Sequence, residues 1–418
     1  MVLAIVSGDS IAYLAAYGIA NIETGEKMTP DMMVSVASVS KMVTAATAVV
    51  LAANGKLDLD APVRTYLPWL PERLGAVTMT QLLSHTSGMD DRTPGISPEP
   101  NGTITPICRA LIDANLMAAP GVVWSYSNAG FTLAGCVIEA VAKAPFGVAV
   151  NRTLFQPLGM TRSTYNPRIA MTYPHAQGHD PRGAAAVVQR PYNGSPSITP
   201  AGELITTMGD LARFSRALLL DGVVGRTRLL PAGVLVKMTQ VQGRGSPFLA
   251  GARDYGLGLF VRAHRGLRIA EHEGIYGGFG ASLAFAPERQ LAVIAVSNSR
   301  YSAPVRTTQA SLEVLAGLAP SVIETTAMPL TARDSLALAG RYARGTDTLR
   351  IESVNGRLSL REESRAWAIT SHADGVFWVT GHPPVMPLSA NTLEPVNIGA
   401  DGRAGWVRLS WRAYPRIP

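Results

Sequence analysis

The stretch that decides the fold is residues 38–55, SVSKMVTAATAVVLAANG, near the start of the 418-residue chain. Its apolar run predicts a helix over 41–53, and Asn54 followed by Gly55 is a typical C-terminal cap. Because this helix is apolar on almost every face, we expect it inside the protein rather than on its surface.

Ser38 and Lys41 stand three residues apart at the start of this helix, so their side chains point to the same side. The serine hydroxyl lies at a helix N-terminus, where backbone N–H groups favour developing negative charge. Apolar surroundings disfavour the charged form of Lys41 and can make it a usable base. By itself, the pair is equally consistent with a helix cap beside an ordinary lysine.

The order of the other elements predicts one discontinuous α/β (α+β) domain. Strand-like runs cover 2–6 and 11–17. Helices follow near 105–117, 129–143, 209–220 and 231–239, with a Pro/Gly-punctuated region at 160–200. Strands return at 255–263, 267–272, 280–286 and 291–297, before a helix near 302–317. We therefore expect one domain over 1–318 whose first strands rejoin the last ones.

The C-terminal part has a different pattern. Residues 319–333 are interpreted as a linker, and short β runs follow at 348–354, 357–361, 366–370 and 376–380. Asn355-Gly356 between two of these runs is typical of a type I′ hairpin turn. The sequence therefore predicts a small antiparallel β domain over 334–418.

The charge and cysteine patterns narrow the possible functions. The net charge is +7, but the basic residues are scattered singly, which argues against a nucleic-acid partner. No apolar run reaches the ~18–20 residues needed to span a bilayer. Two cysteines, Cys108 and Cys136, are too few for a disulfide framework, and Cys136, in an apolar stretch, is expected as a free buried thiol. Charged residues are only 16%, which favours an association surface and leaves a homo-oligomer open.

A second motif is Trp124-Ser-Tyr126-Ser-Asn128, just before a predicted helix. One interpretation makes Tyr126 a buried aromatic and Asn128 an N-cap. The functional one needs a phenol that exchanges a proton with Lys41 and an amide that holds a substrate carbonyl.

A third motif is Glu271-His272-Glu273-Gly274-Ile275, before a clear strand. Gly274 lets a ligand backbone approach a strand edge. A zinc helix of the H-E-x-x-H kind would need histidine where Tyr276 stands. His175 and His179, in a Pro/Gly loop, are a weak metal hint, and we expect neither metal nor cofactor.

In this order, the three motifs resemble those of the serine β-lactamase and penicillin-binding-protein superfamily. The match is best to its class C β-lactamase-like branch of esterases, D-aminopeptidases and D,D-carboxypeptidases. It covers about residues 1–318 and implies a catalytic domain there, with a central antiparallel sheet flanked by helices. The stretches 82–88, 200–202, 210–214 and 255–258 are similar as well. The C-terminal part is similar to the barrel-like accessory domains of some of these hydrolases.

The resemblance implies a role for each motif residue. Ser38 would be the acylated nucleophile, with Lys41 and Tyr126 as its proton-transfer network. Backbone N–H groups of Ser38 and Ile275 would form the oxyanion hole. The substrate would be lined by Asn128, His272, Gly274 and Ile275.

The sequence departs from the family pattern in two ways. His272 stands where these enzymes usually place a carboxylate-attracting lysine, and histidine is mostly neutral at pH 7. The chain also starts at its first strand, without the leading helix we would expect, and its short apolar start, residues 1–6, is not expected to be a signal peptide. Localisation thus stays open between the bacterial cytoplasm and, if a longer natural protein exists, the periplasm or secretion.

The function expected from these features is metal-independent serine hydrolysis of a small ester, amide or short peptide through a Ser38 acyl-enzyme. Substrates without a free carboxylate are favoured, as for an esterase or D-amino-acid amidase. One alternative is a penicillin-recognising D,D-peptidase or β-lactamase. Another is a non-catalytic binding protein on the same fold, against which the intact Ser38, Lys41 and Tyr126 argue. No G-x-S-x-G elbow occurs, which disfavours an α/β-hydrolase.

Overall fold

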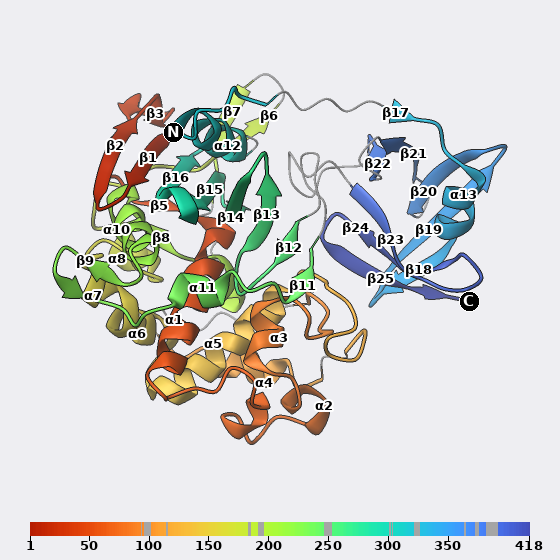
Figure 1. Ribbon diagram of the computed structural model, residues 1–418, viewed down its shortest axis with the longest axis horizontal. Helices are drawn as coiled ribbons and strands as arrows, with labels where there is room; N and C mark the ends of the chain where they lie inside the picture. The colour runs from red at the N-terminus through yellow and green to blue at the C-terminus, as the bar shows by residue number, and fades with distance from the viewer. Residues whose placement is uncertain are drawn as a thin grey trace.

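The computed structural model describes residues 1–92, 94–95, 102–113, 116–182, 185–190, 196–245, 253–300, 302, 304–321, 327–362, 365–372, 376–381 and 392–418. A sheet with helices around it forms the larger body, and a β structure formed by the C-terminal residues lies beside it (Figure 1).

The larger body is built on an eight-stranded sheet in the order β11-β12-β13-β14-β15-β16-β1-β2. Its strands are β11 (Gly243–Arg244), β12 (Asp254–Tyr255), β13 (Phe260–His264), β14 (Leu267–Tyr276), β15 (Phe279–Ala286), β16 (Leu291–Ser297), β1 (Val2–Ser7) and β2 (Ser10–Ala16). All these pairings are antiparallel, and Val2 lies opposite both Val296 and Ala16. The first strands thus rejoin the last ones, as the sequence predicts.

The helices lie on the sheet and in a large region below it in Figure 1. Those against the sheet are α10 (Met208–Leu219) and α12 (Pro304–Leu315). The lower region contains α1 (Ser40–Ala53), α2 (Glu72–Gly75), α3 (Met79–Leu83), α4 (Thr105–Ala110), α5 (Asn128–Ala142), α6 (Phe146–Val150), a π-helical turn (Asn151–Phe155), α7 (Gln156–Leu158), α8 (Pro167–Ala170), α9 (Thr199–Gly202) and α11 (Val234–Met238). The short strands outside the eight-stranded sheet are β3 (Ile19–Asn21), β4 (Glu26–Lys27), β5 (Val34–Ser35), β6 (His179–Arg182), β7 (Ala185–Val188), β8 (Ile205–Thr206), β9 (Val223–Val224) and β10 (Thr227–Arg228).

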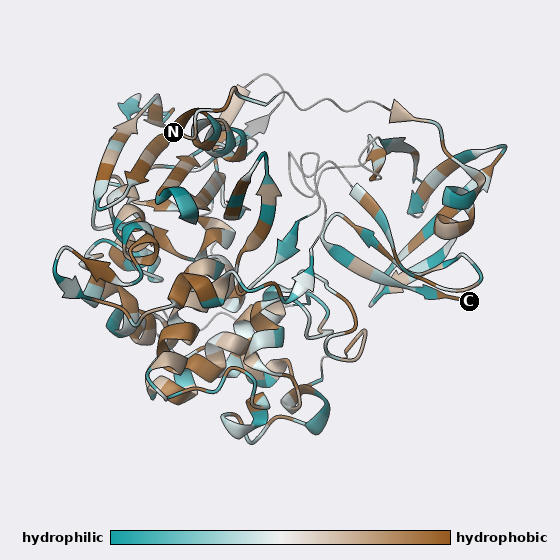
Figure 2. Ribbon diagram, viewed as in Figure 1, coloured by the Kyte–Doolittle hydropathy of each residue, from teal (hydrophilic) through white to brown (hydrophobic). Residues whose placement is uncertain are grey.

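Helix α1 has the environment that its composition predicts. Its residues from Ser40 to Leu51 are all buried, and brown, hydrophobic segments gather around it in Figure 2. It ends at Ala53 with Asn54 as its C-cap, and Gly55 follows with a φ of 70°, the left-handed conformation typical just after a helix. The predicted helix at 105–117 is shorter, because after α4 the chain turns and Leu116 bridges to Met89.

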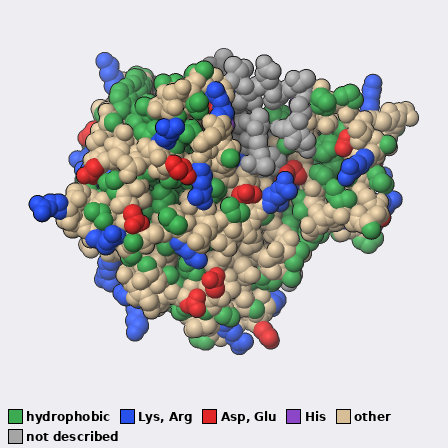
Figure 3. All heavy atoms as spheres, viewed as in Figure 1, with side chains coloured by type: hydrophobic (Ala, Val, Ile, Leu, Met, Phe, Trp, Pro, Cys, Tyr) green, Lys and Arg blue, Asp and Glu red, His purple; other side chains and the backbone are tan. Residues whose placement is uncertain are grey.

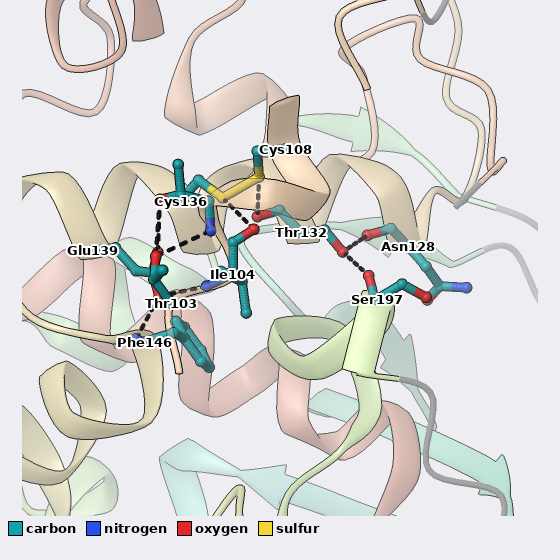
Figure 4. The surroundings of a disulfide bond; sticks show 10 residues. Thr103, Ile104, Cys108, Asn128, Thr132, Cys136, Glu139, Phe146 and Ser197 are labelled. Atoms are coloured by element: carbon teal, nitrogen blue, oxygen red, sulfur yellow. Dashed lines mark hydrogen bonds between the residues drawn. A yellow bond between two sulfur atoms is a disulfide. The ribbon is translucent and has the colours of Figure 1, made fainter. Parts of the chain in front are cut away.

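Cys108 and Cys136 form a disulfide that joins α4 to α5 (Figure 4). The expectation of a free thiol at Cys136 is wrong. Packing of α4 against α5 brings both buried sulfur atoms together, a contact that the cysteine count alone does not reveal. Glu139 of α5 also holds the segment before α4, because its carboxylate accepts hydrogen bonds from the backbone N–H of Ile104 and the hydroxyl of Thr103.

The C-terminal strands close into a β-barrel-like structure. They are β18 (Gly340–Arg344), β19 (Asp347–Val354), β20 (Arg357–Glu362), β21 (Arg365–His372), β22 (Phe377–Thr380), β23 (Thr392–Ile398), β24 (Ala404–Leu409) and β25 (Arg412–Ile417). Neighbours pair antiparallel around the ring, with β18 joined to β25 and β21 to β22. Asn355 and Gly356 both have positive φ between β19 and β20, as a type I′ turn requires.

The barrel has its own apolar core, which includes Tyr342, Leu360 and Val407. The stretch interpreted as a linker contains β17 (Ala327–Met328), which pairs with β21, and the first residues of α13 (Ala332–Leu338). Because the cores are separate, we propose a domain boundary within 319–333.

On the face shown in Figure 3, lysine and arginine side chains stand apart from one another rather than in one patch. In the described part of the chain, no single helix is long and apolar enough to cross a membrane, although the bent pair Asn128–Ala142 and Phe146–Leu158 passes that test together.

Candidate active site

Ser38 lies in a short 3-10 turn, Ala37–Val39, between strand β5 and helix α1. The turn starts with Ala37 at a φ of 47°, in the left-handed region. The neighbouring Ser40 is directed elsewhere: its hydroxyl donates to the carbonyl of Ala37 at 2.6 Å and accepts the N–H of Leu204 at 3.0 Å. Ser38 is thus the serine that faces Lys41.

Lys41 is fully buried, and its Nζ lies at hydrogen-bond distance from three oxygen atoms. These are Ser38 Oγ at 3.3 Å, Asn128 Oδ1 at 2.8 Å and the carbonyl of Ala201 at 2.9 Å. Burial lowers the pKa of Lys41 well below its usual value. The buried amine therefore has the character of a base, as the apolar helix predicts.

Tyr126 donates a hydrogen bond from its hydroxyl to the same Ser38 Oγ, at 2.9 Å. The Lys41 ammonium nitrogen lies 4.6 Å from the centre of the tyrosine ring. Burial raises the pKa of Tyr126 well above its usual value, which keeps the phenol protonated. The hydroxyl of Ser38 therefore lies between an amine whose neutral form is favoured and a phenol whose protonated form is favoured.

Strand β14 passes directly beside Ser38. A Cβ atom on Gly274 would come within 2.6 Å of the Ser38 backbone nitrogen, so only glycine fits there. Ile275 follows it in the strand, opposite Gly280 of β15. The close approach explains the glycine of the third motif.

His272 is buried two residues earlier on β14. Its Nδ1 donates to the carbonyl of Glu273 at 2.6 Å, which leaves Nε2 to accept from the Tyr255 hydroxyl at 3.1 Å. Burial and the charge of Lys41 lower the pKa of His272 to about 3. The imidazole is therefore neutral at pH 7 and its ring lies 6.3 Å from that of Tyr126.

The glutamates of this motif point to the other face of β14, because side chains alternate along a strand. Arg253 pairs with Glu271 at 3.1 Å and with Glu273 at 2.8 Å. Burial alone would raise the pKa of Glu271, but Arg262 and Arg253 lower it to about 2. These carboxylates are structural ion-pair partners of the sheet.

The barrel supplies a wall of the site that the sequence analysis missed. The Tyr126 N–H donates to the carbonyl of Trp411 at 2.8 Å, and the Ala413 N–H donates to Ser125 Oγ at 3.1 Å. The Trp411 ring is buried against Tyr126 at 5.4 Å and Phe260 at 5.6 Å. The turn between β24 and β25 is thus inserted beside the second motif.

Asp91 and Arg412 are two further residues without a motif. Arg412 Nε donates to Asp91 Oδ2 at 2.9 Å, and Asp91 accepts the backbone N–H of Asn128. Since Asn128 accepts from Lys41, a chain of contacts joins the barrel to the buried amine. Asp91 raises the pKa of Lys41 and Arg412 lowers it, so the pair acts on the base with opposite signs.

The supporting stretches of the sequence hold these groups in place. The Ser127 N–H donates to Nδ1 of the buried His85 at 3.0 Å. Ala201 supplies a carbonyl to Lys41, and a Cβ on Gly258 would lie 2.5 Å from the Lys41 carbonyl. His85, Ala201 and Gly258 lie in the stretches 82–88, 200–202 and 255–258, whose resemblance to the family pointed to them in the sequence.

Within the described ranges, no group of three or more His, Cys, Asp or Glu side chains is arranged to hold a metal ion. His179 donates from Nδ1 to the carbonyl of Asn298 at 2.8 Å and accepts the Ile22 N–H on Nε2. Both ring nitrogens of His179 are thus engaged in holding loops together.

The family model named Beta-lactamase matches residues 1–318. The chain belongs to the Beta-lactamase family. It is a hydrolase of the serine β-lactamase and penicillin-binding-protein type, as the three motifs predict, and the mixed α/β fold with its barrel agrees.

Several relatives carry informative names. "Penicillin-binding protein 4" of Amycolatopsis lactamdurans is 29% identical over 79% of this chain and 89% of its own length. "Esterase EstB" of Burkholderia gladioli is 36% identical over 36% of this chain and 43% of its own length. The match to the penicillin-binding protein thus covers most of both chains, whereas the match to the esterase covers less than half of either.

The similarity to solved structures includes the barrel. The crystal structure of SurE has a TM-score of 0.79 and 28% identity, and covers 100% of this chain and 94% of its own. A second structure, of SurE with D-Leu, has a TM-score of 0.77 and 26% identity, and covers the same shares of the two chains. An octameric penicillin-binding protein homologue from Pyrococcus abyssi has a TM-score of 0.69 at 22% identity, covers 100% of this chain and 95% of its own, and shares the fold.

Proposed function

We propose that this protein hydrolyses small esters, amides or short peptides through an acyl-enzyme on Ser38. The observation that carries the proposal is that Ser38 Oγ lies 3.3 Å from the Lys41 amine and 2.9 Å from the Tyr126 hydroxyl. A serine becomes a nucleophile when an adjacent base takes its proton. The depressed pKa of Lys41 makes it that base.

Acylation follows from these positions. Neutral Lys41 takes the Ser38 proton as Oγ bonds to the substrate carbonyl carbon, and the carbonyl oxygen becomes negative. The backbone N–H groups of Ser38 and Ile275 stabilise that oxyanion, each contributing about 3–4 kcal/mol to the lowering of the barrier. Tyr126 gives its proton to the leaving alcohol or amine, and Lys41 returns the serine proton through the phenol. Water then attacks the ester bond to Ser38 in the same way.

The substrate is held by groups that carry no net charge. The Asn128 side-chain amide and the edge of β14 around Gly274 offer hydrogen bonds to a carbonyl or an N–H group. His272, with a pKa of about 3, adds no positive charge. We therefore propose a preference for acyl groups without a free carboxylate, of the esterase or D-amino-acid amidase kind. The relatives named esterase and SurE with D-Leu support this direction.

A penicillin-recognising D,D-peptidase or β-lactamase is the second candidate, and one observation favours it. The guanidinium of Arg412 lies 5.9 Å from the centre of the Tyr126 ring and brings a positive charge toward the site. Asp91 compensates that charge by direct pairing, so we place this candidate second. Under either candidate function, we propose that the protein forms a homo-oligomer, which light scattering tests.

The experiment compares short-chain p-nitrophenyl esters, D- and L-amino-acid anilides and a chromogenic cephalosporin, each with wild type and Ser38→Ala. Ser38-dependent turnover of the esters or anilides supports the proposal. Faster turnover of the cephalosporin than of every ester and anilide would move the second candidate to first place. Unchanged turnover in Ser38→Ala would contradict both.

A further inference from the structure

An apolar cavity of about 350 Å³ lies next to the Ser38 site, but none of the three proposed catalytic side chains lines it. Its walls come from β5, helix α8, β8 and the turn after β14. Met33, Ala170 and Ile205 form a buried cluster in these walls, and Phe279 lies beside them. The volume falls within the ~300–1,000 Å³ range of small-molecule sites.

One polar group in the walls lacks a partner. Ser35 is only 3% exposed, and among the described residues its hydroxyl makes no hydrogen bond. An unsatisfied buried hydroxyl costs about 1–3 kcal/mol. Its oxygen is itself buried, so it presents no hydrogen-bonding surface to the cavity. The cavity therefore fits an apolar group.

The cavity is joined to the site by two short segments of chain. Ser35 precedes Ser38 by three residues, so their Cα atoms are at most about 11 Å apart. Gly277, which lines the cavity, follows Ile275 by two residues, at most about 7 Å along the chain. A group bonded to Ser38 could therefore reach the cavity.

Strand β14 and the turn after it run from Tyr126 past Ser38 to the cavity. His272 lies at the Tyr126 side, Gly274 beside Ser38, and Gly277 at the cavity. The leaving group must be on the Tyr126 side, because it takes a proton there. The acyl side chain is then directed along β14 toward the cavity.

We propose that this cavity binds the acyl side chain of the substrate and selects unbranched or aromatic apolar acyl groups of medium length. This inference rests on the proposed Ser38 chemistry and names the substrate class for it. Met171, which is 65% exposed, stands at the mouth of the cavity, whereas Ala170 is 4% exposed in its wall. Arg168 and Gln177 add a polar margin.

The test keeps the leaving group constant and varies the acyl chain, with p-nitrophenyl acetate, butyrate and hexanoate. Each methylene that enters an apolar site is worth up to about fourfold in binding. We expect wild-type kcat/KM to rise at least thirtyfold from acetate to hexanoate. Met171→Trp, which narrows the mouth, should remove most of that rise and leave the acetate within about twofold.

Ile169→Trp is the matched control, because Ile169 is 43% exposed on helix α8, just before Met171, and does not line the cavity. It should keep the full chain-length dependence. A flat wild-type series, with the acetate still hydrolysed by Ser38, would overturn the cavity's role and leave the proposed function intact. An equal loss in both tryptophan variants would overturn it as well.

A binding measurement tests the cavity without turnover. Hexanamide added to Ser38→Ala protein should give a saturation-transfer NMR signal that Met171→Trp abolishes and Ile169→Trp retains. If neither an ester nor an anilide is hydrolysed through Ser38, the proposed function fails, and this measurement still decides the cavity. Absence of hexanamide binding, or the same binding in all three proteins, contradicts the inference.

Discussion

Arg412, six residues from the end of the chain, pairs with Asp91 through a 2.9 Å hydrogen bond from Nε to Oδ2. The two residues are 321 positions apart. Asp91 in turn accepts the backbone N–H of Asn128, whose side chain accepts from Lys41. The charge of a barrel residue, Arg412, therefore acts on the proposed base, Lys41.

Replacing Arg412 should change the pH dependence of turnover. Arg412 lowers the pKa of Lys41 and Asp91 raises it, so Arg412→Gln leaves only the group that raises it. The pKa of Lys41 then rises, and a higher pH is needed to form the neutral base. We expect the acid limb of the kcat/KM profile to move to higher pH, with activity at pH 7 reduced about tenfold or more.

Arg408→Gln is the control for this experiment. Arg408 is also buried in the barrel and lies over the Trp124 ring at 5.1 Å, but it pairs with Glu394 rather than with Asp91. It should leave the acid limb in place even if it lowers stability. The same displacement in both variants would show that barrel docking, not the Arg412 charge, sets the profile.

Lys41 and Tyr126 should behave as one proton-transfer unit, because both contact the same oxygen of Ser38. Lys41→Met and Tyr126→Phe should each lower kcat by about 10²–10⁴. The double variant should be little worse than the worse single one, since effects within a unit are not additive. Losses that multiply in the double variant would mean that the two residues act independently.

His272→Lys tests the proposed preference for uncharged acyl groups. A lysine there restores a charge-assisted hydrogen bond worth about 1.5–3 kcal/mol. We expect the ratio of kcat/KM for a carboxylate-bearing ester to that for its neutral analogue to rise ten- to a hundredfold. His272→Gln is the neutral control, and melting temperatures check that both variants fold. A wild type that already favours the carboxylate ester, with no gain from lysine, would refute this account of His272.

The disulfide should contribute to stability without affecting the site chemistry. It closes a loop between residues 28 positions apart, for which loop-closure entropy gives about 3–4 kcal/mol. The double variant Cys108→Ala/Cys136→Ala should lose that amount of unfolding free energy in urea titrations, and keep its ester turnover at 25 °C. A loss below about 1 kcal/mol would mean that the packing of α4 on α5 holds without the bridge.

The sequence predicts what local pattern controls. The apolar run after Ser38 forms a buried helix, and Asn355-Gly356 forms the expected turn. Ser38, Lys41 and Tyr126 could be found because each belongs to a short motif, and the structure brings the three together.

What the sequence missed depends on long-range packing. Asp91 and Arg412 have no motif, and they are far apart in the chain, so their pairing cannot be read from spacing. Strand β25 contains Pro415 and two arginines, which weakens its strand pattern. A pair of cysteines 28 residues apart is compatible with free thiols or a bridge, and only the contact of α4 with α5 decides.

The central claim is that Ser38 is the acylated nucleophile. Intact-mass spectrometry after incubation with a fluorophosphonate tests it most directly, with Ser40→Ala as the neighbouring control because the Ser40 hydroxyl is turned to the Ala37 carbonyl. We predict a single adduct on wild type and on Ser40→Ala, and none on Ser38→Ala. An adduct that forms on Ser38→Ala at the wild-type rate would contradict the account.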